Sequence, residues 1–179
     1  MNLIILGRDG VINQCSDSLI KSAEEWEPIP GSLEAIAQLN RHDYHVVIMS
    51  NQTGIGSRLY DIDTLNQIHD KLFQQLSALG GSIDCILFCP HEEHQECDCR
   101  KPKPGLLLDL QDRLNMPLTN VPVVGDDLTD LQVAREVGAR PILVKSGRGA
   151  KTSDTAVGLD NVEVFDDLAD YVEQLLAQA

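Results

Sequence analysis

Apolar runs and amphipathic segments alternate along most of this chain. The apolar runs are short and often β-branched, which predicts buried strands at 3–6, 46–49, 83–88, 121–124 and 141–144, and a shorter strand at 162–165. Three- and four-residue steps between apolar positions predict helices at 32–41, 62–79, 105–115 and 166–176, and one more that ends at Val137. Strands that alternate with helices indicate an α/β fold of the Rossmann type, in which a parallel sheet carries helices on both faces and forms three layers.

A few residues punctuate these elements. Ser32 is the expected N-cap of the first helix, and Pro122 marks the expected start of a strand. The segment 14–27 has no clear periodicity and 146–161 is rich in Gly, Ser and Thr, so both are expected to be loops. Because no insertion is long enough to form a separate cap, we predict one domain over 1–179 without a large cap domain.

The composition is that of a soluble globular protein. The chain has 179 residues, of which 42% are hydrophobic and 23% are charged, and this is enough for one sizeable core. No segment approaches the roughly 20 apolar residues of a membrane span, and the N-terminus lacks an export signal, so we expect a cytoplasmic monomer that binds no membrane. The net charge of −14 argues against nucleic-acid binding. It would also repel an anionic substrate, which therefore needs a local cationic pocket or a metal ion.

Polar groups follow four of the predicted strands. In chain order these groups are Asp9, then Ser50 and Asn51, then Arg100 and Lys101, then Asp126, Asp127 and Asp130. Parallel strands place their carboxyl ends at one edge of the sheet, where ligands bind in such folds. The carboxylates could hold Mg²⁺, and the hydroxyl, amide and cationic groups could bind phosphate oxygens. Each group alone is explained as well by a turn, a cap or a solvated charge, but their joint occurrence favours a phosphate-processing site.

Five cysteines are present, and three of them cluster beside a histidine. Cys89-x-His91 followed by Cys97-x-Cys99 offers three thiolates and one imidazole, a set that suits tetrahedral Zn²⁺ in a closed structural site. His94 is a competing ligand, but we prefer His91 because it pairs with Cys89 as Cys97 pairs with Cys99. Free thiols in a loop are the alternative. The odd number and the clustering argue against a disulfide framework and for a reducing compartment.

Several further polar or aromatic residues are expected to be structural. Trp26 is expected to anchor the loop over the site, and His69 is expected to be a structural histidine on a helix. The cations Lys145, Arg148 and Lys151 could attract phosphate, although solvated surface charges account for them more simply.

Five motifs carry a resemblance that covers nearly the whole chain. They are GRDGVIN (7–13), SNQTGI (50–55), CPH (89–91), CDCRKPKPG (97–105) and VGDDLTD (124–130). With them the chain closely resembles the D-glycero-D-manno-heptose-1,7-bisphosphate 7-phosphatase family of the haloacid dehalogenase superfamily, whose nearest relatives include histidinol-phosphate phosphatases. The resemblance implies Mg²⁺-dependent removal of the 7-phosphate from a heptose bisphosphate, a phosphorylated sugar on the route to lipopolysaccharide core.

The resemblance also implies a role for each motif residue. Position 7 would be the nucleophile and a Mg²⁺ ligand. Asp9 would be the general acid/base and would ligate Mg²⁺ through its backbone carbonyl, while Asp126 would be a further Mg²⁺ ligand. Ser50 and Lys101 would stabilise the transferring phosphoryl group. Substrate contacts are implied for Cys15, Ser16, Asp17, Ser18, Asn51, Gln52, Thr53 and Arg100.

Two positions depart from the family pattern. At 56–58 the chain has Gly-Ser-Arg where the family usually has Ala-Arg-Gly, which shifts an arginine. More importantly, Gly7 stands where the nucleophilic aspartate is expected, and glycine can neither attack phosphorus nor ligate Mg²⁺ through a carboxylate. We favour an Asp→Gly change in an otherwise ordinary phosphatase. The alternatives are a catalytically dead relative that binds a phosphosugar and a phosphatase with a different mechanism.

Two further functions stay open. A histidinol-phosphate phosphatase would use the same chemistry on a different leaving alcohol. The other is an interaction module stabilised by zinc, and the intact surroundings of Asp126 and Lys101 disfavour it.

Overall fold

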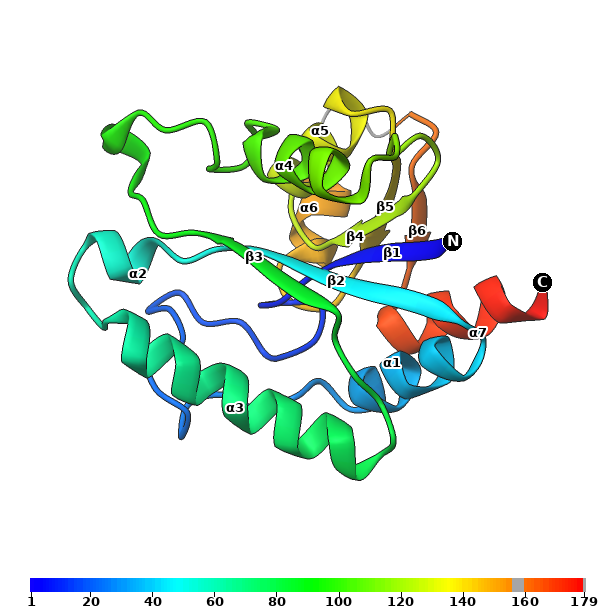
Figure 1. Cartoon of the computed structure of the whole chain (residues 1–179), viewed down its shortest axis with the longest axis horizontal. Helices are drawn as coiled ribbons and strands as arrows, with labels where there is room; N and C mark the ends of the chain where they lie inside the picture. Colours follow the sequence, from blue (N-terminus) through cyan, green and yellow to red (C-terminus); the bar gives the residue numbers. More distant parts are fainter. Residues whose placement is uncertain (156–159, 179) are drawn as a thin grey trace.

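The computed structural model describes residues 1–155 and 160–178, and it contains a six-stranded parallel sheet (Figure 1). The sheet order is β3-β2-β1-β4-β5-β6, so β1 lies at its centre. The strands are β1 (Asn2–Gly7), β2 (Tyr44–Asn51), β3 (Cys85–Cys89), β4 (Pro122–Gly125), β5 (Arg140–Val144) and β6 (Glu163–Phe165). The helices are α1 (Ser32–Arg41), α2 (Thr53–Gly56), α3 (Ile62–Ala78), α4 (Gly105–Leu114), α5 (Leu128–Glu136), α6 (Gly149–Thr155) and α7 (Leu168–Ala177), with a 3₁₀ turn η1 (Glu93–Gln95). The predicted parallel α/β fold is confirmed.

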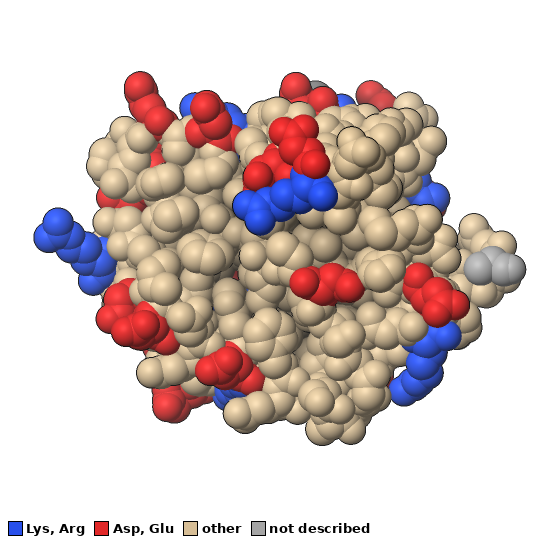
Figure 2. Space-filling model, viewed as in Figure 1, with Lys and Arg blue, Asp and Glu red and all other residues tan. Residues whose placement is uncertain are grey.

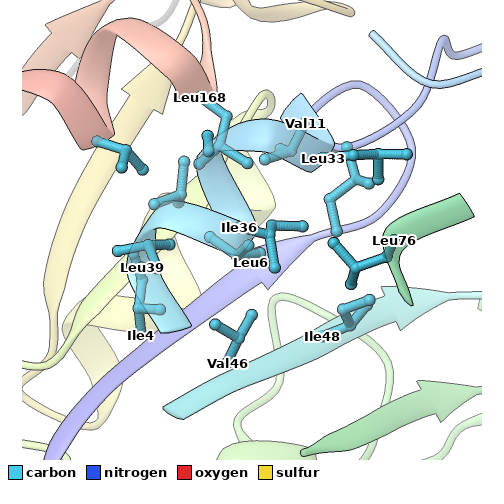
Figure 3. Packing of buried hydrophobic residues seen from close by; sticks show 14 of the residues in the cluster. Ile4, Leu6, Val11, Leu33, Ile36, Leu39, Val46, Ile48, Leu76 and Leu168 are labelled. Carbon is cyan, nitrogen blue, oxygen red and sulfur yellow. The ribbon is translucent and has the colours of Figure 1, made fainter. Parts of the chain in front are cut away.

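Alternation along the strands divides the buried side chains between two faces of the sheet. Ile4 and Leu6 of β1 pack against Ile36 of α1, in a cluster that also includes residues of α3 and α7 (Figure 3). Leu3 and Ile5 belong to a second cluster, with apolar residues of α4 and α5. In Figure 1, α4 and α5 accordingly lie on one side of the sheet, and α1, α3 and α7 lie on the other. The three predicted layers are therefore present.

The start of α1 differs from the prediction. The N-cap is Gly31, with φ of 84°, and the predicted cap Ser32 is already the first helical residue. Its buried hydroxyl donates to the carbonyl oxygen of Ile12 at 2.6 Å instead of capping the helix. The hydroxyl is used in this way because the chain after β1 packs directly against the start of α1, and sequence pattern alone could not show this contact.

The predicted loop 146–161 is also partly wrong. Residues 149–155 form the short helix α6, while 156–159 lie outside the described residues. Thr152 Oγ1 donates to the carbonyl oxygen of Asp126 at 2.9 Å, and Ser146 Oγ donates to the carbonyl oxygen of Gly10 at 2.8 Å. These tertiary contacts hold α6 against the ends of β1 and β4, although its Gly, Ser and Thr residues have low helix propensity.

The surface charge is spread over the molecule. On the face drawn in Figure 2, acidic side chains lie in separate groups with a few Lys and Arg among them. None of the helices within residues 1–155 and 160–178 is long and apolar enough to cross a bilayer.

Candidate active site and metal centres

A cavity of about 300 Å³ opens beyond the carboxyl ends of β1, β2 and β4. Ten of the predicted site residues line it: Gly7, Asp9, Cys15, Ser16, Ser50, Asn51, Thr53, Arg100, Lys101 and Asp126. Seven further residues complete the lining: Arg8, Leu19, Met49, Asp127, Thr129, Asp130 and Arg148. The convergence of strand ends that the sequence predicted is therefore present in the structure.

Three residues expected to contact substrate do not line this cavity. Gln52 is buried beneath Ser50, because its side chain turns back into the protein. Asp17 is fully exposed, and the exposed Ser18 has its hydroxyl 2.9 Å from the Ser16 hydroxyl. The periodicity of the chain gives no orientation for side chains in a loop, which is why these positions could not be separated from Cys15 and Ser16.

The Asp9 carboxylate is held from two sides. Arg8 Nε donates to Asp9 Oδ1 at 2.8 Å and Arg8 Nη2 donates to Oδ2 at 3.2 Å. Asn13 Nδ2 also donates to Oδ1 at 2.9 Å. The guanidinium of Arg8 is buried, so this forked contact is shielded from water and fixes the orientation of the carboxylate. Asp9 is thus a carboxylate of fixed orientation at the edge of the cavity.

Gly7, the last residue of β1, and Gly10, in the loop that follows, differ in their need for glycine. Gly10 has φ of 85°, and a Cβ there would collide with the Asp126 carboxylate, so the loop needs glycine at this position. Gly7 does not have a positive φ, and a Cβ there would lie 3.1 Å from Val11 Cγ2 and 3.5 Å from the carbonyl oxygen of Val124. A shift of a few tenths of an ångström by the buried Val11 side chain would therefore admit a Cβ at position 7. Nothing in the backbone calls for glycine there.

A buried chain of hydrogen bonds orients Ser50. Gln52 Nε2 donates to Ser50 Oγ at 2.6 Å, and the Tyr60 hydroxyl donates to Gln52 Oε1 at 2.5 Å. Burial raises the pKa of Tyr60 to about 12, so its hydroxyl stays a donor. Because Ser50 Oγ already accepts a hydrogen bond, its own proton is available to a ligand oxygen in the cavity. Tyr60 was not predicted, since a lone tyrosine after a glycine-rich turn carries no distinctive signal.

Lys101 forms a buried ion pair with Asp130. The Lys101 ammonium donates to Asp130 Oδ1, and both side chains are almost inaccessible to solvent. Burial alone would lower the pKa of Lys101, but the negative charges of Asp130 and Asp127 raise it above its ordinary value. The ammonium therefore remains charged at the cavity wall. Asp130 also accepts hydrogen bonds from the backbone N–H groups of Asp126 and Asp127, at 3.2 and 3.3 Å.

Asp126, Asp127 and Asp130 bring carboxylate oxygens within 4.8 Å of one another. Asp127 is the N-cap of α5 and accepts from Thr129 N at 2.8 Å, while Asp130 is paired with Lys101. Asp126 Oδ2 accepts from the backbone N–H of Arg148 at 2.9 Å, and its Oδ1 accepts no hydrogen bond within the described residues, so this carboxylate can bind a cation. Burial, and then the charge of Asp130, raises the pKa of Asp126 to about 7. A cation bound beside it would lower that pKa again, because an opposite charge favours the ionised carboxylate. This oxygen-rich, acidic set fits Mg²⁺.

The predicted Cys/His set is assembled beside the cavity. Cys89 Sγ, His91 Nδ1, Cys97 Sγ and Cys99 Sγ lie within 4.8 Å of one another. His94 is mostly exposed and its Nδ1 lies 3.6 Å from Glu92 Oε2, so the structure favours His91 over His94 as the fourth member. Three sulfurs and one imidazole nitrogen fit tetrahedral Zn²⁺.

The Cys/His loop is tied directly to a cavity residue. Arg100 Nη1 donates to the carbonyl oxygen of His91 at 3.2 Å and to Thr53 Oγ1 at 2.7 Å. A change in the loop would therefore move the guanidinium that lines the cavity. This link gives the cluster an indirect influence on the site.

Comparisons with known proteins agree with this geometry. A profile of the HAD-hydrolase-like family matches residues 98–171. The chain is 48% identical to D-glycero-beta-D-manno-heptose-1,7-bisphosphate 7-phosphatase of Bordetella bronchiseptica over the full length of both, and 44% identical to the Pseudomonas putida enzyme of that name over 98% of this chain and 100% of the relative. A crystal structure of D,D-heptose 1,7-bisphosphate phosphatase from B. bronchiseptica, complexed with magnesium and phosphate, matches with a TM-score of 0.98 at 47% identity, covering all of both chains. A crystal structure of D,D-heptose 1,7-bisphosphate phosphatase from Burkholderia thailandensis matches with a TM-score of 0.79 at 38% identity, covering 99% of each chain.

Proposed function

This chain belongs to the heptose-1,7-bisphosphate 7-phosphatase family of haloacid dehalogenase-type hydrolases, and we propose that its site binds D-glycero-D-manno-heptose 1,7-bisphosphate as a Mg²⁺-dependent phosphatase that removes the 7-phosphate. The observation that carries this proposal is the cavity, where a hydroxyl, an ammonium, a held carboxylate and an acidic cluster face one space. Full-length identity of 42–48% to relatives of that name supports the same substrate class.

The residues present support distinct steps of phosphoryl transfer. The Lys101 ammonium and the Ser50 hydroxyl would donate to oxygens of the phosphoryl group and stabilise its developing charge. Asp9 would give a proton to the leaving alcohol and later take one from the attacking water. Asp126, with the backbone carbonyl of Asp9, would hold Mg²⁺, which neutralises phosphate charge when it is bound. Asn51 and Arg100, with the loop that carries Cys15 and Ser16, would contact the sugar phosphate.

The nucleophile is the missing component. An aspartate at position 7 would attack phosphorus and form an acyl-phosphate, whereas Gly7 offers no attacking atom. The remaining groups could bind and polarise the substrate but not open the covalent route, so we expect this form to be strongly impaired. The ordinary backbone of Gly7 supports a simple exchange of aspartate for glycine, because no positive φ requires glycine at this strand end.

The remaining features complete the proposal. The chain acts as one domain over 1–179, and its loop 89–99 holds Zn²⁺ through Cys89, His91, Cys97 and Cys99. This zinc is structural, since all four positions are filled by protein ligands. The protein works as a cytoplasmic monomer in lipopolysaccharide-precursor metabolism.

The direct test compares the chain with Gly7→Asp and Gly7→Asn, with Mg²⁺ present. Phosphate release is measured on heptose 1,7-bisphosphate, in both anomers, and on histidinol phosphate. We expect turnover of the heptose substrate only with Gly7→Asp, because Asn matches Asp in size but is not a nucleophile. Equal turnover by all three would overturn the lost-nucleophile account.

Other outcomes identify the rival functions. A preference of Gly7→Asp for histidinol phosphate would change the substrate class. Tight binding of the bisphosphate by all three variants with turnover by none would identify a phosphosugar-binding protein, the rival that Gly7 itself supports.

A further inference from the structure

Four basic side chains line the cavity, and they differ in what they already bind. Arg8 is buried against Asp9, and the Lys101 ammonium is paired with Asp130. Arg100 Nη1 already donates to the carbonyl oxygen of His91 and to a hydroxyl. Only Arg148 is left with a head group that is both half-exposed and, among the described residues, without a hydrogen bond from its guanidinium.

The backbone of Arg148 is nevertheless fixed to the reacting end of the site. Its N–H donates to Asp126 Oδ2 at 2.9 Å. The neighbouring Ser146 and Thr152 donate to the carbonyl oxygens of Gly10 and Asp126, so the turn before α6 is anchored on both sides of Arg148. The long, cationic side chain of Arg148 therefore extends from an anchored turn beside Asp126, the proposed Mg²⁺ ligand.

The only ion-pair partner of Arg148 among the described residues is weak, and it lies on the loop after β1. Arg148 Nη2 is 3.6 Å from Asp17 Oδ1, longer than a hydrogen bond, and the Asp17 side chain is fully exposed. Asp17 belongs to the loop whose residues Cys15, Ser16 and Leu19 line the cavity. An exposed ion pair of this kind contributes little free energy, so a ligand with a stronger negative charge can displace Asp17.

A sugar bisphosphate presents such a charge. Its reacting phosphate meets Ser50, Lys101 and the acidic cluster, so the second phosphate must be bound elsewhere in a protein with a net charge of −14. Guanidinium groups pair with phosphate through two parallel hydrogen bonds, and such charge-assisted bonds are roughly twice as strong as neutral ones.

We propose that Arg148 binds the non-reacting phosphate of the substrate and determines the preference for a bisphosphate over a monophosphate. This inference rests on the proposed function, because it takes the heptose bisphosphate as the ligand. In the free protein Arg148 rests against Asp17, and in the complex the phosphate replaces that carboxylate. Arg148 acts on binding rather than on the chemical step, since it contacts the end of the sugar that does not react.

The test uses the full chain with Gly7 in place and measures binding by calorimetry with Mg²⁺ present. Because we expect this form to turn the substrate over very slowly, the measured binding is an equilibrium. The two ligands are heptose 1,7-bisphosphate and heptose 7-phosphate, which differ only in the phosphate assigned to Arg148. We expect Arg148→Ala to weaken bisphosphate binding by about tenfold or more, the size of a lost charge-assisted hydrogen bond, and to leave heptose 7-phosphate binding nearly unchanged. Arg148→Lys should recover part of the loss, because it restores the charge without the fork.

The matched control is Lys151→Ala, which removes an exposed cation of α6 that does not line the cavity. It should change neither affinity, which excludes a general effect of net charge. Equal weakening of both ligands by Arg148→Ala, or no weakening of either, would overturn the proposal for Arg148 while leaving the phosphatase assignment intact. Failure of both ligands to bind the Gly7 chain and Gly7→Asp, with no turnover by the latter, would overturn the proposed function and this inference together.

Discussion

Arg8 Nη1 lies 3.2 Å from Nε2 of His69, and both side chains are buried. The same guanidinium uses Nε and Nη2 to hold the Asp9 carboxylate, so Arg8 links a helix residue of α3 to a carboxylate at the cavity edge. Since an arginine only donates, Nε2 of His69 must accept, and the imidazole is neutral. Burial, and then the positive charge of Arg8, lowers the pKa of His69 to about 4.

This pair predicts an acid-sensitive fold. A histidine with a folded-state pKa of about 4 and an ordinary value of 6.5 contributes its full stability above pH 6.5 and loses it as the pH falls toward 4. Between about pH 7.5 and about pH 4.5 the parent chain should lose roughly 2 kcal/mol more unfolding free energy than His69→Gln, which keeps an acceptor for Arg8 but does not titrate. Urea unfolding at several pH values measures the difference. Parallel pH curves for the two proteins would contradict the prediction.

The same pair shows what sequence could and could not provide. The position of His69 on a helix correctly indicated a structural histidine, and the motif correctly placed Asp9 at a strand end. The contact between Arg8 and His69 joins residues 61 positions apart and depends on how α3 crosses the sheet, which hydrophobic periodicity does not specify. The cavity lining was predictable because parallel strands end at one edge, whereas the supporting hydrogen bonds behind it were not.

The hydrogen-bond chain behind Ser50 predicts a selective loss of catalytic rate. Tyr60→Phe removes the donor to Gln52 Oε1 and leaves a buried acceptor unpaired, which should cost about 1 kcal/mol of stability. In a Gly7→Asp background, kcat should fall roughly three- to tenfold because Ser50 is less well oriented, while KM changes little. Steady-state phosphate release provides both constants. Tyr44→Phe is the matched control, and an equal fall in kcat with that variant would remove the special role of Tyr60.

The buried Lys101–Asp130 ion pair predicts that a second substitution can restore stability without restoring turnover. Lys101→Met should abolish turnover in the Gly7→Asp background and destabilise the fold by about 3 kcal/mol or more, because the Asp130 carboxylate is left buried without its counter-charge. The double variant Lys101→Met with Asp130→Asn should recover most of the stability and none of the turnover. Thermal unfolding and phosphate release on the three proteins test this. If the double variant stays as unstable as the single one, the ion pair is not the source of the destabilisation.

The Cys/His cluster predicts a metal-dependent link to substrate binding. The purified chain should contain about one zinc ion, which Cys97→Ala and His91→Ala should lose, while His94→Ala and Cys85→Ala should retain it, because neither residue belongs to the cluster. Loss of the metal should loosen the carbonyl of His91 that accepts from Arg100, so the affinity for the heptose bisphosphate should fall by roughly tenfold. Elemental analysis and calorimetry on the same samples measure both effects. Retained zinc in Cys97→Ala, or zinc loss without any loss of affinity, would show that the cluster does not support Arg100.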